Sequence, residues 1–342
     1  MGLWGRTKRY GPIVDQLREE VTPAGQLVLD SPEDDLAVAL AAAAAGEAAP
    51  VQSYLASLRL SQSWELRSRG LDRIAALALD SPLWVKRWAQ AQPEDPDAQL
   101  TLASLLVKLA WEARTNAQAE HVEGWRFREF HEQLEAAAPQ LQLAAELNPA
   151  DPEPWRLSMQ QATGLEAPYE TFHRYLTNAR EADPWHYPSC EQAVNRLSAK
   201  WGGSHEAAFD FAEYLAGGAP DDRVVHILPM RAAFEMWVQE PQAKPRFAAR
   251  SNVAIQHAQS FADRFPPGAR EAAEARNMLG YLYAKSDRFQ QAFDALHATR
   301  HNVSRMPWAY ELVDGKDYLE QFATLREAVV IKLAQVLAGA KR

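Results

Sequence analysis

The side chains best able to do chemistry gather between residues 111 and 131. His121 and His131 lie ten residues apart and belong to neither an HExxH motif nor a Glu-x-x-His pair, so their spacing indicates no metal site. Aromatic and arginine side chains are favoured anchors of protein-binding surfaces. The segment therefore predicts a binding surface, with a buried salt-bridge network between helices as the alternative. Its candidate partner-binding residues are Trp111, Arg114, His121, Trp125, Arg128 and His131.

A second group of candidates lies between residues 185 and 206. A nucleophilic role for Cys190 needs a base, which His186 or His205 could supply, but no local signature of such an enzyme accompanies it. Gly202-Gly203 and Ser204 are explained by a tight turn and a helix N-cap. We therefore expect no catalytic residue here. The partner-binding residues expected in this group are Trp185, His186, Lys200 and Trp201.

Composition narrows the class of protein. The net charge of −9 and a pI near 5.6 disfavour nucleic-acid binding, which needs a basic footprint. Cys190 is the single cysteine, so neither an intrachain disulfide nor a CxxC metal knuckle can form. The most apolar stretch, residues 36–45, is far shorter than the roughly 20 residues of a membrane span. We expect a cytoplasmic protein without an integral membrane segment.

The elements that position these residues are expected to be helices, because strong helix formers dominate and runs of Val, Ile and Thr are nearly absent. Residues 1–30 are predicted to be a tail and linker. An unstructured basic tail is favoured over a weak anchor for a membrane or an acidic partner. Ser31-Pro32-Glu33-Asp34 opens the first predicted helix of a divergent helical region over residues 31–92.

The clearest pattern lies in residues 276–299. Leu279-Gly280, Tyr283, Ala292 and Leu296 follow the spacing W-x2-L-G-x2-Y…A-x3-F. Gly280 and Ala292 are small, which lets two antiparallel helices approach closely. Ser286-Asp287 is predicted to form the turn and to cap the second helix. This segment resembles a tetratricopeptide repeat, with Arg276 at the usual Trp position.

Similar turns recur along residues 93–300, which we interpret as tetratricopeptide-like repeats. Residues 98–114 are predicted to form the first helix of one unit, with an insertion near 115–130. Residues 301–342 are expected to form C-terminal capping helices. The block 200–209 is also similar to uncharacterised bacterial helical-repeat proteins. The predicted fold is an all-α, irregular solenoid of antiparallel helical hairpins.

A solenoid presents an extended concave surface, so the expected function is that of a non-catalytic scaffold or adaptor without a cofactor or metal. The partner would be a protein or peptide segment with carboxylates and apolar anchors. Three alternatives stay open. The chain could be an immunity- or regulator-type protein that blocks an enzyme, a subunit of a larger assembly, or a metal-dependent or hydrolytic enzyme. The enzyme would use His121, His131, His186 and His205.

Overall fold

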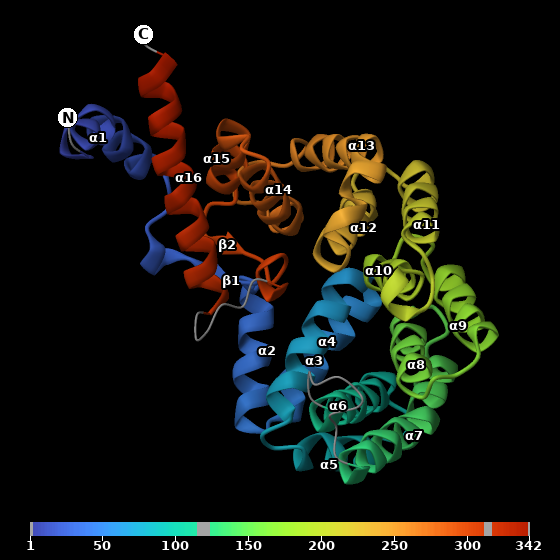
Figure 1. The fold of residues 1–342 in the computed structure, drawn as a ribbon. Helices are drawn as coiled ribbons and strands as arrows, with labels where there is room; N and C mark the ends of the chain where they lie inside the picture. Colours follow the sequence, from blue (N-terminus) through green and yellow to red (C-terminus); the bar gives the residue numbers. More distant parts are fainter. Residues whose placement is uncertain (1–2, 115–123, 311–316, 341–342) are drawn as a thin grey trace. The chain divides into compact units, whose positions relative to one another are not determined.

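The computed structural model describes residues 3–114, 124–310 and 317–340. These residues form sixteen α-helices and one pair of two-residue strands (Figure 1). The prediction of an all-α chain is therefore confirmed at the level of secondary structure. Among the described residues, the structure contains no helix that could span a lipid bilayer.

The chain folds into two compact units. Residues 32–208 form the central unit, and residues 1–31 together with 209–342 form the outer unit. The helices of the central unit are α2 (Asp34–Ala45), α3 (Ala48–Leu60), α4 (Trp64–Ala78), α5 (Leu83–Ala91), α6 (Pro96–Arg114), α7 (Gly124–Leu147), α8 (Glu153–Gly164), α9 (Tyr169–Ala182) and α10 (Tyr187–Arg196).

Helix α11 (His205–Gly218) spans the boundary between the two units. The remaining elements of the outer unit are α1 (Leu3–Glu20), β1 (Val28–Leu29), α12 (Leu228–Gln239), α13 (Lys244–Ala262), α14 (Ala273–Lys285), α15 (Phe289–Ala298), β2 (Asn302–Val303) and α16 (Tyr318–Ala340). The predicted repeat region, 93–300, therefore crosses from one unit into the other.

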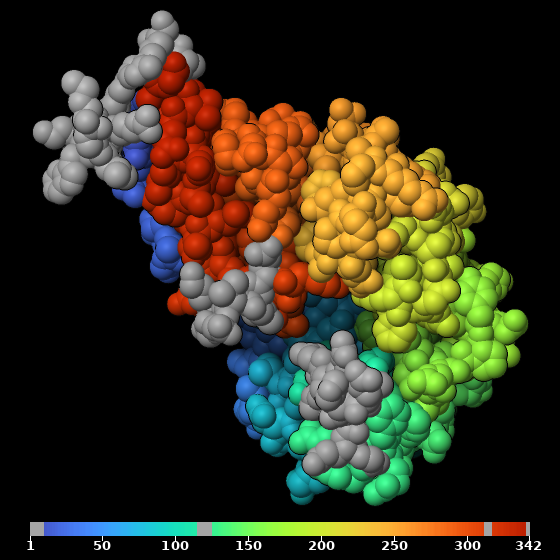
Figure 2. Space-filling model, in the orientation of Figure 1, coloured from blue at the N-terminus to red at the C-terminus, as the bar shows by residue number. Residues whose placement is uncertain are grey.

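The two ends of the outer unit are joined to each other. Strand β1 pairs in parallel with β2, and the backbone N–H groups of Val28 and Asp30 donate to the carbonyls of His301 and Val303. Helix α1 packs against α16, where Arg18 forms an ion pair with Glu327. In the space-filling view, the atoms of α16 (red) adjoin those of α14 and α15 (orange) (Figure 2). The expectation of an unstructured N-terminal tail is wrong, because residues 3–20 are helical.

Helices α14 and α15 pack as the repeat pattern predicts. Leu279, Tyr283, Ala292 and Leu296 are all buried between helices. A Cβ atom on Gly280 would lie 2.5 Å from Cγ and Cδ2 of Leu296, so only glycine permits this approach.

The turn that joins α14 to α15 differs from the prediction in one respect. Ser286 is the C-cap of α14, and Asp287 has the left-handed φ of 56° that closes the turn. The N-cap of α15 is Arg288, without a side-chain hydrogen bond. The predicted turn is confirmed, whereas the predicted capping role of Ser286-Asp287 is wrong.

The predicted first helix over residues 98–114 is confirmed as α6. Residues 115–123 of the predicted insertion lie outside the described residues, and residues 124–130 form the first turns of α7 rather than part of an insertion. The predicted C-terminal capping region, residues 301–342, contains the long helix α16.

Candidate interaction site

The aromatic part of the site is built where α6 and α7 pack together. Phe127, Phe130 and His131 follow the i, i+3, i+4 spacing that places side chains on one face of a helix. Phe130 is fully buried and meets the Trp111 ring of α6 edge-on, with ring centroids 5.2 Å apart. Gly164 of α8 lies against the same ring, because a Cβ atom there would lie 2.8 Å from Phe130 Cζ. Three helices thus fix these rings.

Arg114 is the last residue of α6, and the helix dipole stabilises a positive charge at this end of a helix. Its guanidinium carbon lies 5.3 Å from the Trp111 centroid and 5.7 Å from the Phe130 centroid, and the side chain is half-buried. Arg114 forms no ion pair with any carboxylate in the described part of the chain. Stacking uses the face of a guanidinium and leaves its in-plane N–H groups available for hydrogen bonds.

The first turn of α7 carries the exposed part of the site. Trp125 is 50% exposed, and the guanidinium carbon of Arg126 lies 4.9 Å from the Trp125 centroid. Arg128 is exposed and has no ion pair within the described ranges. We call the whole set the α6–α7 surface; it comprises Trp111, Arg114, Trp125, Arg126, Phe127, Arg128, Phe130 and His131.

Two histidines of this segment, His121 and His131, were predicted to contact a partner, and the structure describes only His131. His131 is half-buried and packs against aromatic rings, with centroids 5.3 Å from Phe127 and 5.5 Å from Phe130. His131 is therefore a member of the aromatic cluster. His121 lies outside the described residues.

His186 does not belong to a surface, which corrects the prediction that it contacts a partner. It is fully buried at the start of α10, where its Nε2 lies 2.9 Å from Ser68 Oγ and its Nδ1 lies 2.8 Å from Ser189 Oγ. Ser68 Oγ also lies 2.5 Å from Glu153 Oε2. These contacts belong to a buried polar network between α4, α8 and α10.

The hydrogen bonds of Ser68 do not have the arrangement of a serine nucleophile and its base. The Ser68 hydroxyl donates its one proton to Glu153 Oε2, so it can only accept from His186 Nε2. A catalytic histidine would instead accept the serine proton. All three side chains are at most 1% exposed, so substrate could not reach them.

The remaining members of the network are ion pairs. Arg67 donates to Asp151 at 2.8 Å and contacts Asp97 at 2.7 Å, and Arg156 donates to Glu153 and to Asp72. Burial is the largest influence on Glu153 and raises the pKa of its carboxyl, although Arg156 opposes this. This buried salt-bridge network joins α4, α6 and α8, so it is not the network predicted as an alternative for residues 111–131.

The other predicted contacts of the second group lie elsewhere in the central unit. Trp185 and Trp201 are half-buried and Lys200 is exposed. They flank α10, whose close helix contacts are with α4, α8 and α9. Cys190 is fully buried in α10. In the described ranges, no three His, Cys, Asp or Glu side chains come together as a metal site.

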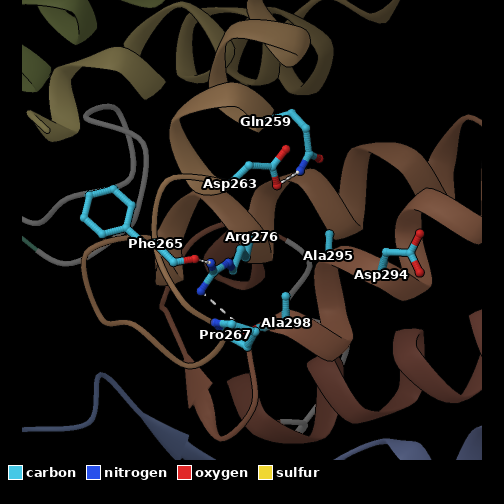
Figure 3. A pocket seen from close by; sticks show the side chains of 8 residues that line it. All are labelled: Gln259, Asp263, Phe265, Pro267, Arg276, Asp294, Ala295 and Ala298. Carbon is cyan, nitrogen blue, oxygen red and sulfur yellow. Dashed lines mark hydrogen bonds between the residues drawn. The ribbon is translucent and has the colours of Figure 1, made fainter. Parts of the chain in front are cut away.

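The outer unit contains a small cavity of about 320 Å³ beside Arg276 (Figure 3). The Arg276 guanidinium donates to the carbonyls of Ala262, Phe265, Pro266 and Ala298, so it caps the C-terminal ends of α13 and α15. Asp263 accepts from Gln259, and the Asp294 side chain points away from Arg276 in this view. Arg276 therefore stabilises the ends of these helices and is not available to a ligand in the cavity.

Comparison with known proteins gives no family for this chain. No protein-family model matches it, and no curated protein matches it significantly.

Sequence reasoning found most of this surface but missed Arg126, Phe127 and Phe130. The signal was present, because residues 127, 130 and 131 have the helical spacing of a single face. The predicted insertion at 115–130 hides this spacing, because α7 in fact begins at Gly124.

Proposed function

We propose that this protein is a non-catalytic interaction scaffold, and that its α6–α7 surface binds a peptide segment bearing carboxylates. We further propose that its helices are organised as an irregular, tetratricopeptide-like solenoid. The α14–α15 pair supports that organisation, because its buried residues and the glycine contact match the repeat pattern.

The observation that carries the proposal is the position of Arg114. Two aromatic rings hold its guanidinium in place without a carboxylate partner among the described residues. A planar guanidinium held in this way loses little side-chain entropy when it binds a carboxylate with two parallel hydrogen bonds. A carboxylate of a partner is therefore the favoured ligand.

Neighbouring side chains define the rest of the partner. Arg128 adds a second cation, and Trp125 offers an exposed aromatic face. Two cations and an exposed indole match a segment in which acidic residues flank an apolar anchor.

The test is to select peptides from a random display library against the full-length protein and to measure the affinity of the best one. We expect acidic positions beside an aromatic or aliphatic residue. The double variant Trp125→Ala/Arg128→Ala should weaken binding at least about tenfold, the equivalent of about 1.4 kcal/mol. Replacement of the peptide's Glu residues by Gln should weaken binding similarly.

The matched control is Arg87→Ala/Tyr214→Ala, which removes an exposed arginine and an exposed aromatic elsewhere. It should bind like the wild type. Equal affinity of the Trp125→Ala/Arg128→Ala variant would remove the α6–α7 surface from the function. A large loss of its melting temperature would show that the cluster is part of the core.

A further inference from the structure

Two histidines of the outer unit face each other across a short distance. His226 lies in a short 3₁₀ helix (Val224–Ile227) that packs against α13, and α13 carries His257. His226 Nδ1 lies 2.8 Å from His257 Nε2, and the ring centroids are 4.9 Å apart. His226 is 6% exposed, whereas His257 faces solvent.

The second nitrogen of His226 fixes which atom can act as a ligand. His226 Nε2 lies 2.9 Å from the carbonyl oxygen of Pro220. A carbonyl only accepts, so Nε2 carries the proton and Nδ1 of neutral His226 presents its lone pair toward His257. Metal-binding histidines have this arrangement, in which the other N–H is held by a carbonyl and fixes the ring.

We propose that His226 Nδ1 and His257 Nε2 together bind one late first-row divalent cation, of which Zn²⁺ is the probe. On binding, His257 carries its proton on Nδ1 instead of Nε2, so the neutral pair releases no net proton. The N···N distance must widen from 2.8 Å to about 3.3 Å for two bonds of about 2.0–2.1 Å. Solvent-facing His257 can make this small rotation, and water completes the coordination.

The charges around the pair are compatible with a cation. Arg264, whose charge acts on His257, is paired with Asp221 at 2.5 Å. Burial, followed by His226 and Arg264, lowers the pKa of His257. The Phe261 ring packs beside the His226 ring, with the two ring centroids 6.0 Å apart.

The number of ligands predicts the type of site. No third His, Cys, Asp or Glu joins the pair among the described residues. Imidazole prefers Zn²⁺, Ni²⁺ and Cu²⁺ to the oxygen-seeking Mg²⁺ and Ca²⁺. Binding should therefore be selective for these metals and exchangeable, and it should hold residues 220–227 against α13.

The test is titration of the metal-free, full-length protein with ZnCl₂ by isothermal calorimetry, together with the imidazole nitrogen resonances in NMR. We expect one saturable site that shifts the signals of His226 and His257, and no such site for MgCl₂. His257→Gln should lower Zn²⁺ affinity at least about tenfold, whereas His301→Gln, which removes an exposed histidine of the same unit, should not.

Three results would overturn this proposal: no saturable Zn²⁺ site in the wild type, equal Zn²⁺ affinity in His257→Gln, or zinc-induced shifts confined to other histidines. Because His257 is exposed, its replacement should leave the helical signal unchanged, and circular dichroism checks this. The peptide-binding measurements above are independent of all three outcomes.

Discussion

At the residue scale, two arginines of the central unit show how partners decide the role of a side chain. Arg67 is fully buried, and its charge is matched by Asp97, Asp151 and the carbonyl of Leu55. Arg114 is half-buried on two rings and has no carboxylate partner in the described ranges. The buried ion pairs of Arg67 fix the packing of helices, because removing one partner would leave an uncompensated charge. Of these two arginines, only Arg114 remains available to a ligand.

Tyr54 provides a prediction for stability at alkaline pH. Burial, followed by the carboxylate of Glu33, raises the pKa of Tyr54 to about 12. A tyrosine in the unfolded chain titrates near pH 10, so between about pH 10 and 12 the unfolded chain loses a proton that the folded chain keeps. The free energy of unfolding should therefore fall as pH rises through this window.

Tyr54→Phe should remove this part of the pH dependence. Urea unfolding at pH 9 and pH 11 should show a smaller loss of stability for the variant than for the wild type. Tyr214→Phe, which changes a tyrosine that is 63% exposed, serves as the control and should lose as much as the wild type. An equal loss in all three proteins would contradict the prediction.

The candidate residues were predictable only where local spacing carried the information. Trp111, Arg114, Trp125 and Arg128 were found because aromatic and basic residues cluster in the sequence. The burial of His186 could not be found in this way, because its partners Ser68 and Glu153 lie far away along the chain. Residue type alone does not distinguish a core histidine from a binding one.

At the scale of elements, the close approach of α14 and α15 gives the sharpest prediction. Gly280→Ala would place a Cβ atom 2.5 Å from Leu296, and overpacking of this kind costs about 1–3 kcal/mol. Urea unfolding should show this loss. The control is Gly217→Ala in α11, where no atom lies within 4 Å of the added Cβ and stability should rise by up to about 1 kcal/mol.

A double variant separates this contact from a general effect of alanine. The Gly280→Ala/Leu296→Ala variant should lose less stability than the sum of the losses measured for the two single variants. The smaller side chain at position 296 makes room for the methyl group added at position 280. Additive losses would show that the Leu296 contact is not the cause.

The sequence signals for helices were reliable where they were local and failed where packing decides. The α14–α15 pair and the extent of α6 followed from periodicity and turn residues. Helix α1 was missed because it has no acidic residue in its first turn and contains Gly5, Gly11 and Pro12, which are poor helix formers. It packs on α16, and the sequence shows no sign of that contact.

At the scale of the whole molecule, the outer unit is built from two separate stretches of chain. Deletion of residues 1–31 should therefore destabilise the outer unit and leave the central unit intact. Asn302–Val303 would lose its strand partner, and α16 would lose the helix that covers it. Hydrogen exchange measured by mass spectrometry should become faster in α16 and β2 and stay unchanged in α4, α6 and α8. Unchanged exchange in α16 would contradict this.

The β1–β2 pairing also sets an order of events during synthesis on the ribosome. Residues 28–29 are made about 270 residues before their partners at 302–303. At about 5–20 residues per second, the nascent N-terminal segment waits for some 15–50 seconds before it can complete its unit. Residues 32–208 need no later residue for their own core, so the central unit can fold first. Residues 28–29 therefore reach their final place only after most of the outer unit has been made.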